Sequence, residues 1–270
     1  MRRLLPILAL SLSACAPAFH SAFAQQRESG DPWRWAGDIA KDRTVFVRNM
    51  NGAVRVEQGT GNKVEVTATK HWRRGNPDDV KITVEQVGSG KGDVLVCAVW
   101  REGDRCDESG YHSSRSNWGW NDNTNDVNVE FVVRLPAGVR MDGRTVNGEI
   151  DIDGATSSVV ARTVNGGVRA RSTGGPVSAE TTNGSINVRT ATIGDDHSNY
   201  RTVNGSITVE VAESSNASLD MSTVNGSVES DFPITIEGRI NRKHIRGTLG
   251  KGGPTVTLST VNGSIRLRKA

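Results

Sequence analysis

The chain has 270 residues, of which 30 are Gly and 8 are Pro, and 35% of its residues are hydrophobic and 5% aromatic. This apolar content is low for a single compact core, but Val and Ile recur in ordered strings that argue against disorder. The formal net charge of +3 falls to +1 if Arg2 and Arg3 are removed with an export signal. No basic stripe suggests a nucleic-acid binder, and no apolar run of about 20 residues suggests a membrane span.

The first residues have the features of an export signal. A basic start, Met-Arg-Arg, precedes an apolar stretch over residues 4–12. The motif Leu-Ser-Ala-Cys, which ends at Cys15, resembles a bacterial lipobox. Processing at a lipobox would remove residues 1–14 and lipidate Cys15. The alternative is an Ala-Phe-Ala site that ends the signal peptide at residue 24. The first site predicts a lipoprotein anchored to the outer membrane, at the periplasm or cell surface, and the second a secreted protein.

Two thiols remain after this segment, those of Cys97 and Cys106. In an oxidising compartment, an even pair at short spacing favours a disulfide. A Glu-Gly-Asp turn between them predicts a hairpin with the cysteines facing each other across two strands. Closing a loop of about ten residues contributes about 2–3 kcal/mol in the chain-entropy model. The spacing matches no structural zinc site.

Asn-Gly recurs through the chain and sets its organisation. The last six copies lie in motifs of the type Thr-Val-Asn-Gly-Ser-Ile, at spacings of 18, 18, 21, 21 and 37 residues. The last spacing is close to two periods, so one unit is expected to be degenerate or to carry an insertion near residues 239–253. The asparagines are Asn51, Asn147, Asn165, Asn183, Asn204, Asn225 and Asn262.

Apolar and polar residues alternate on both sides of each Asn-Gly, which is the period of half-buried strands. The phase of this alternation slips by one residue at the Asn-Gly pair. A straight strand cannot change face in this way, so the chain must bend there. Asn tolerates the left-handed backbone conformation and Gly adopts it freely.

We therefore predict an all-β, single-stranded β-solenoid (β-helix) of 18–21-residue coils with Asn-Gly bends. Each coil should cover its neighbour in the sequence, with the repeated asparagines stacked as a structural ladder. An antiparallel meander is the alternative. Residues 25–41 are expected to form a tether and cap, and residues 42–270 the solenoid, with an inserted exposed loop at about 103–125. Its elaborated N-terminal part should contain the disulfide hairpin and strands over residues 63–69, 80–87, 93–100 and 126–135.

The repeated words resemble a family of bacterial envelope proteins that are named as proposed adhesins and contain a β-strand repeat domain. The matching words are the Thr-Val-Asn-Gly-Ser-Ile repeats and the closing Gly-Gly-Pro segment that leads to Asn262. The resemblance covers residues 44–267. It implies an exported repeat protein with no established activity and no catalytic residues. The loop at 103–125 is not part of the family pattern.

Two sets of charged residues each allow a functional and a structural interpretation. One is a partial basic stripe, three residues before the Asn, which could hold an anionic glycan or could be a solvated face. Its members are Arg48, Arg144, Arg162 and Arg201. The other is an alternating run of carboxylates, usable by a polysaccharide-cleaving enzyme but also typical of a soluble face. It consists of Glu149, Asp151 and Asp153.

All six Trp precede residue 121, and two of them lie in the polar loop. Exposed aromatic rings stack on sugars, so Tyr111, Trp118 and Trp120 are candidate ligand contacts. The alternative is that the Trp residues cap the solenoid end. Residues 121–126 are rich in oxygen atoms but lack the Gly and terminal Glu of a calcium loop, so we expect no metal and no cofactor.

Together these features predict a non-catalytic exported envelope protein, adhesin-like or a scaffold. Its partner would be an envelope or extracellular glycan or another envelope protein, with the membrane reached only through a lipid anchor. The alternative is a polysaccharide-binding or polysaccharide-degrading β-helix protein. A cluster of like charges facing one groove across neighbouring coils would favour that alternative.

Overall fold

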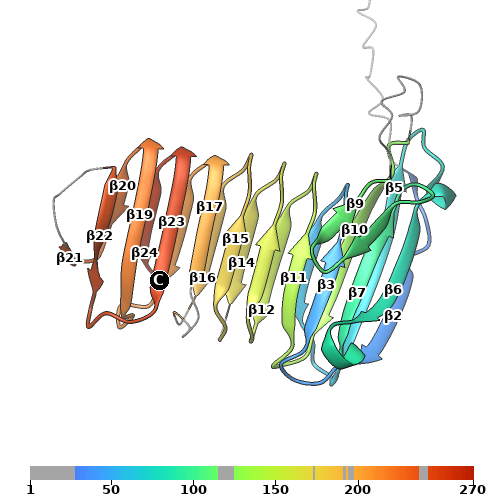
Figure 1. Ribbon diagram of the computed structural model, residues 1–270, viewed down its shortest axis with the longest axis horizontal. Helices are drawn as coiled ribbons and strands as arrows, with labels where there is room; N and C mark the ends of the chain where they lie inside the picture. The colour runs from blue at the N-terminus through green and yellow to red at the C-terminus, as the bar shows by residue number, and fades with distance from the viewer. Residues whose placement is uncertain (1–27, 115–124, 173, 191–192, 194–197, 237–242) are drawn as a thin grey trace, which may run out of the picture.

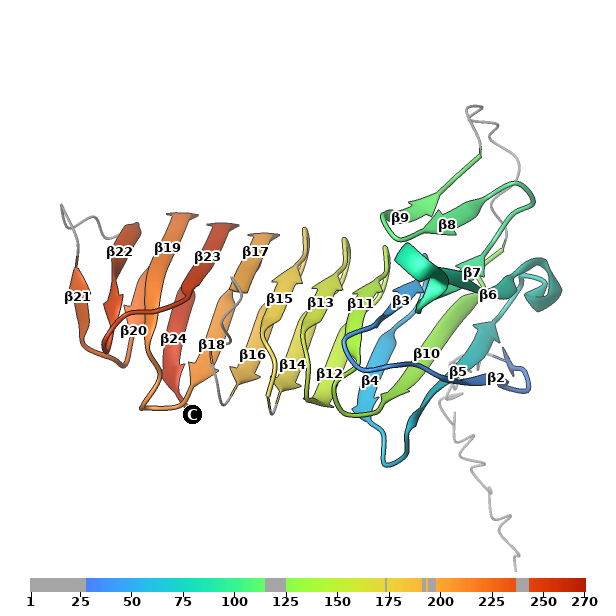
Figure 2. The same cartoon turned by 60° about the horizontal axis from the view of Figure 1, so that its bottom comes forward.

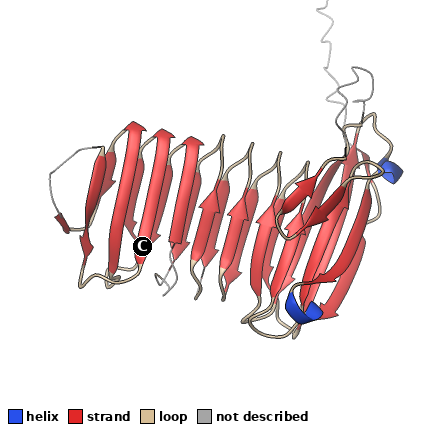
Figure 3. Ribbon diagram, in the orientation of Figure 1, coloured by secondary structure: helices blue, strands red, loops and turns tan. Residues whose placement is uncertain are grey.

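A computed structural model describes residues 28–114, 125–172, 174–190, 193, 198–236 and 243–270. The all-β class is confirmed, since its other regular elements are two short 3-10 turns, η1 (Pro77–Asp79) and η2 (Ser89–Lys91) (Figure 3). The strands form two large facing sheets and one small two-stranded sheet (Figures 1 and 2).

The first large sheet contains eleven strands. In spatial order they are β1 (Glu28–Ser29) with β2 (Trp33–Asp38), β5 (Lys63–Trp72), β10 (Asn128–Leu135), β4 (Val54–Gln58), β12 (Ile150–Ala155), β14 (Val168–Ser172), β16 (Ile186–Thr190), β18 (Ile207–Val211), β24 (Ile265–Lys269) and β20 (Val228–Ser230).

The second large sheet also contains eleven strands and faces the first sheet along the array (Figures 1 and 2). In spatial order they are β6 (Lys81–Val87), β7 (Asp93–Val99), β3 (Thr44–Arg48), β11 (Arg140–Arg144), β13 (Val159–Arg162), β15 (Val177–Glu180), β17 (Ser198–Asn204), β23 (Thr255–Asn262), β19 (Ala217–Asn225), β22 (His244–Leu249) and β21 (Ile234–Ile236). The small sheet pairs β8 (Arg105–Asp107) with β9 (Gly110–His112).

Each Asn-Gly unit contributes one strand to each large sheet. Val159 and Ala161 of β13 are buried before Asn165, and Val168 and Ala170 of β14 are buried after it. The phase slip therefore keeps the apolar residues of both strands in one core between the sheets. Neighbouring units pair in parallel with like positions opposite each other, which is against the antiparallel meander. The two sheets do not close into one ring, so the structure shows two facing sheets and leaves the single-stranded solenoid a hypothesis.

The long segment between the first two asparagines does not separate their strands. β12 pairs directly with β4, and β11 pairs directly with β3. The intervening strands extend the far end instead, with β10 parallel to β4 and β7 parallel to β3. Antiparallel β5 and β6 then complete that end. The segment is thus a cap beyond the first unit, joined there by β1 and β2 on β5.

The expectation that each coil covers its sequence neighbour is wrong at the other end. The last unit, β23 with β24, lies between β17 with β18 and β19 with β20. The long spacing before Asn262 holds β21 and β22, which extend the sheet antiparallel to β19. The two units have the same sequence motif, so either one fits beside β17. The strands β22 and β21 belong to no repeat unit, and they form the edge of the second sheet at this end.

Backbones of adjacent units approach each other closely at the bends. A Cβ on Gly148 would lie 2.0 Å from the carbonyl oxygen of Gly52, and one on Gly205 would lie 1.9 Å from that of Gly184. Of the seven Asn-Gly glycines only Gly52 has a positive φ, 126°. The left-handed explanation is therefore wrong for the other six. Glycine is required there because no Cβ fits between the stacked backbones.

The threonine of the Thr-Val-Asn-Gly word completes this contact. The hydroxyl of Thr202 is buried and donates to the carbonyl oxygen of Gly184 at 2.9 Å. In the first unit Asn49 takes this place and donates to the carbonyl oxygen of Val129, which faces Gly52, at 2.8 Å. The same threonine bond recurs at Thr145, Thr163, Thr181, Thr223 and Thr260. The carbonyl oxygen that faces each bend glycine is therefore not left unpaired inside the protein.

We expect Gly205→Ala to lower the free energy of unfolding by about 1–3 kcal/mol, because the new methyl group must push two bends apart. Gly61→Ala is the matched control, since the nearest atom to its Cβ lies 4.0 Å away. Denaturant unfolding followed by circular dichroism measures both. Equal midpoints for the two variants would contradict a steric role of the bend glycine.

Candidate functional site

The seven repeat asparagines form one hydrogen-bonded ladder along the bend edge. Asn147 Nδ2 donates to Asn51 Oδ1 at 2.7 Å, and each further amide donates in the same direction. The last two steps follow the spatial order, with Asn262 donating to Asn204 and Asn225 donating to Asn262. The amides lie at the surface rather than in the core. Each interior amide therefore donates one N–H and accepts one bond within the array, whereas each end rung makes only one of these two bonds.

Three of the four arginines of the basic stripe pair with carboxylates. Arg48 and Arg144 both contact Asp142, each at 2.9 Å. Arg162 lies 3.7 Å from Asp142 and 3.1 Å from Glu180. The interpretation as an open basic stripe is therefore wrong for these three, whereas Arg201 has no ion pair among the described residues. For Arg144 the acidic partner lies on the same strand, and for Arg48 it lies on the strand beside it.

Arg48 differs from the rest of the stripe because its side chain is 0% exposed. Its guanidinium donates to the backbone oxygens of Asp107 at 3.1 Å and of Glu108, in the turn between β8 and β9. Burial lowers the pKa of Arg48 to about 10, although Asp142 opposes this shift. The group therefore stays charged at neutral pH. It fastens the β8–β9 hairpin to the outer face of the second sheet.

A disulfide fastens the same hairpin, as the sequence predicted for Cys97 and Cys106. The predicted hairpin between the two cysteines is wrong, because β7 pairs with β3 and β6 while β8 pairs with β9. The bond joins a buried position of the large sheet to the small one. Two parts of the expected exposed loop, Arg105–Asp107 and Gly110–His112, are strands.

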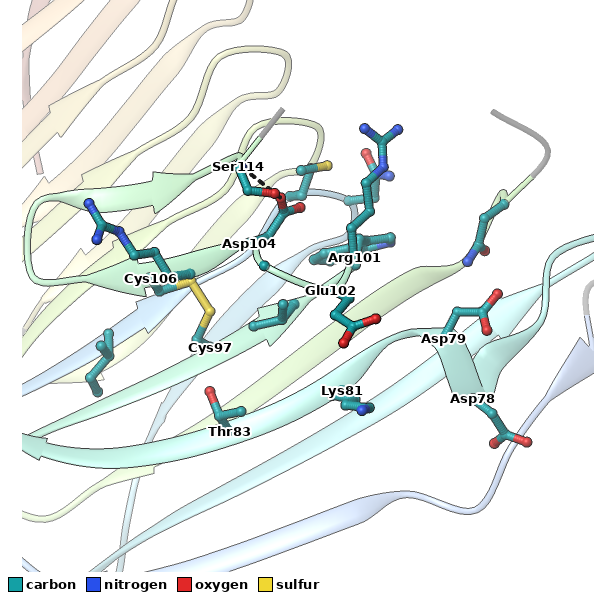
Figure 4. Close-up of a pocket in the computed structure, with 18 of the residues that line it drawn as sticks. Asp78, Asp79, Lys81, Thr83, Cys97, Arg101, Glu102, Asp104, Cys106 and Ser114 are labelled. Carbon is teal, nitrogen blue, oxygen red and sulfur yellow. Dashed lines mark hydrogen bonds between the residues drawn. A yellow bond between two sulfur atoms is a disulfide. The ribbon is translucent and has the colours of Figure 1, made fainter. Parts of the chain in front are cut away.

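A groove of about 990 Å³ opens between this hairpin and the outer faces of β6 and β7. Figure 4 shows Arg101 and Glu102 on the loop after β7, across the groove from Lys81 and Thr83 of β6. The disulfide lies at one side of the groove, and Asp78 and Asp79 of η1 lie at the other (Figure 4).

The charges of the groove contrast with those of the array. On the outer face of the first sheet, charged side chains form ion pairs across strands, such as Arg134 with Glu57 at 3.2 Å and Arg171 with Asp153 at 3.5 Å. Within the described residues, no ion pair joins the charged side chains that line the groove. These are Asp78, Asp79, Lys81, Glu85, Arg101, Glu102, Asp104 and Arg105, so carboxylates outnumber basic groups. All except Asp104, which accepts bonds from Tyr111 and Ser114, remain available to a polar ligand.

The asparagine ladder ends in the same groove. Asn51 is its first rung and lines the groove, and its Oδ1 accepts from Asn147. Its Nδ2 has no hydrogen-bond partner within the part of the chain that the structure describes. Because the amides all point the same way, the ladder presents a donor at this end. The sequence showed the ladder but not its direction.

Tyr111 lies under the groove rather than open to it. Its hydroxyl donates to Asp104, and its ring meets that of Trp100 edge-on with centroids 6.3 Å apart. Burial, together with the bond to Asp104, raises the pKa of Tyr111. Burial alone would raise the pKa of Asp104, but bonds from Tyr111 and Ser114 outweigh it and lower that pKa. Tyr111 therefore supports the loop that carries Arg101 and Glu102.

Three predicted site residues, Cys15, Trp118 and Trp120, lie outside the described residues. The carboxylates of β12 are placed beside arginines, with Asp151 opposite Arg169 and Asp153 opposite Arg171. Among the residues that the structure describes, no three His, Cys, Asp or Glu side chains are grouped to hold a metal ion. No helix in that part of the chain is long and apolar enough to span a membrane.

Residues 119–268, more than half of the chain, match the family model described as Toastrack DUF4097. The chain belongs to the Toastrack DUF4097 family. The match covers the repeats of this Toastrack protein, whereas the groove residues from β6 to β8 precede it. No curated protein matches the chain.

Several solved structures are similar over most of the Toastrack chain. A proposed cell adhesion protein from Clostridium sporogenes aligns at 10% identity with a TM-score of 0.40, covering 89% of this chain and 100% of its own. A proposed adhesin from Bacteroides fragilis aligns at 11% identity with a TM-score of 0.39, covering 89% and 97%. These scores describe a loose overall superposition.

We expect Arg48→Met to lower the free energy of unfolding by about 3 kcal/mol, because buried carbonyl groups lose their donor and Asp142 loses a partner. Proteolysis within residues 105–112 should accelerate, since the hairpin loses one of its two fastenings. The control is Arg201→Met, which changes an exposed side chain at the same offset. If both variants unfold alike and resist protease alike, Arg48 does not hold the hairpin.

Proposed function

We propose that this protein is a non-catalytic, exported envelope protein of the adhesin-like or scaffold type. The repeat array serves as a rigid support, and the groove at its N-terminal end makes the contact. We infer that the support is a flattened solenoid, an inference supported by the one strand that each unit gives to each sheet and by the in-register stacking of like positions. The groove is held on it by Arg48 and by the disulfide.

The unpaired polar groups of the groove carry this proposal. Along the array, the asparagine amides and many charged side chains already have partners within the protein. In the groove, Arg101 and Arg105 have no ion pair among the described residues, and Asn51 offers an amide donor. Donors of this kind bind the hydroxyl oxygens of glycans, and the hydroxyl groups of a glycan can in turn donate to groove carboxylates such as Glu102. A glycan is therefore the partner that we favour over another envelope protein.

A polysaccharide-degrading activity has less support than binding. A glycosidase needs two carboxylates about 5–10 Å apart on either side of the bond that breaks. The run on β12 faces arginines on β14, and Arg171 contacts Asp153 at 3.5 Å. These carboxylates serve cross-strand pairing on a solvated face.

Binding to purified peptidoglycan sacculi and to lipopolysaccharide vesicles tests the groove. We expect the double variant Arg101→Ala, Arg105→Ala to bind at least about a hundredfold more weakly than the wild type to the probe that retains the wild type, since two charged hydrogen bonds are lost and each contributes about 1.5–3 kcal/mol. The control Arg169→Ala, Arg171→Ala removes the same charge from the outer face of β14. Equal losses in both variants, or no retention of the wild type on either probe, would argue against a glycan-binding groove.

Export and lipid anchoring at Cys15 are the second part of the proposal. The mass of the mature N-terminus distinguishes the two processing sites. We expect a lipidated chain that begins at Cys15, because the apolar stretch ends just before that residue. A chain that begins at Gln25 would contradict the anchor while keeping export, and an intact Met1 would contradict both.

A further inference from the structure

The two large sheets have four outer edges, and β6 is the longest of their edge strands. At the C-terminal end of the array, the edges are β20 and β21, each of three residues. At the other end, the first sheet ends in β1, of two residues, and β2, of six residues, with Pro32 between them. The second sheet ends in β6, a regular strand of seven residues without proline.

A long regular edge strand can pair with another chain. β6 pairs only with β7 among the described residues, and its register with β7 has no bulge. Ile82 and Val84 lie on the inward face but are only partly buried. An apolar groove of about 650 Å³ adjoins this strand and is lined by Trp33, Trp72 and Ile82. The edge thus leaves both backbone groups and apolar surface uncovered.

The sequence of β6 is complementary to itself. In an antiparallel pair centred on Thr83, Lys81 of one copy lies opposite Glu85 of the other, and this pair forms twice. Ile82 then lies opposite Val84 on the inward face. Lys81 and Glu85 are exposed, and neither has an ion-pair partner in the part of the chain described. Charge and apolar pattern therefore agree on one register.

We propose that β6 is the interface through which a second copy of this chain binds. The two β6 strands pair antiparallel about Thr83 and join the two second sheets into one. Each copy brings its own Ile82 and Val84 to cover the apolar groove of the other. Lys81 and Thr83 also line the polar groove, so the dimer sets two of these grooves side by side. Two linked contact sites strengthen binding to a repetitive surface.

Charge reversal in the mature full-length protein tests this interface by analytical ultracentrifugation. We expect Lys81→Glu alone and Glu85→Lys alone to weaken the wild-type dimer about tenfold in Kd, because each puts two like-charged pairs across the strands. The double variant Lys81→Glu, Glu85→Lys restores opposite charges and should return Kd to near the wild-type value. Lys251→Glu, an exposed change at the far end, controls for net charge.

Hydrogen exchange gives a second measurement that needs no variant. We expect the backbone amides of β6 to exchange more slowly as the wild-type concentration rises through the dimer transition, because they become paired. A wild-type protein that stays monomeric at every concentration would overturn the proposal. So would a dimer whose Kd is the same in all variants, or β6 amides that exchange equally fast in monomer and dimer. None of these results depends on the ligand of the polar groove.

Discussion

The close approach of neighbouring backbones at the bends governs the rest of this structure. The carbonyl oxygen of one bend glycine lies about 2 Å from the place that a Cβ of the next would take, so the position admits only glycine. That carbonyl oxygen needs a donor, and the buried threonine two residues before the asparagine supplies it. The asparagine amide bonds to its counterpart in the next unit. The Thr-Val-Asn-Gly motif thus makes one set of contacts between neighbouring units, and this set is repeated along the array.

A repeated set of contacts of this kind pairs its own polar groups and leaves little for recognition. Ion pairs such as Arg134 with Glu57 have the same effect on the outer face of the first sheet. The groups that are free to recognise a partner therefore lie where the repetition stops. At the N-terminal end, the cap strands, the disulfide and the buried Arg48 hold a hairpin over the sheet and create a groove with unpaired charges. The same end carries the free edge of β6.

Much of the fold could be predicted, because alternation of apolar residues is a local property of half-buried strands. The phase slip at Asn165 correctly indicated a bend with the apolar side chains of both strands in one core. The candidate site was harder to predict. Arg48 and Arg144 looked like members of a basic stripe, but both contact Asp142, which lies on the strand of Arg144 and beside the strand of Arg48. The threonine hydroxyl had no visible role in the sequence, since its acceptor belongs to the unit beside it.

The sequence by itself determined that each Asn-Gly word makes a bend between two strands and that Cys97 and Cys106 can be joined, because these properties depend on nearby residues. Only the tertiary structure decided that the Asn262 unit lies between those of Asn204 and Asn225. Units with the same words present the same surfaces, so their sequence cannot specify their order. The tertiary structure also decided which charges stay unpaired, because partners such as Glu57 of Arg134 lie on strands that are distant along the chain.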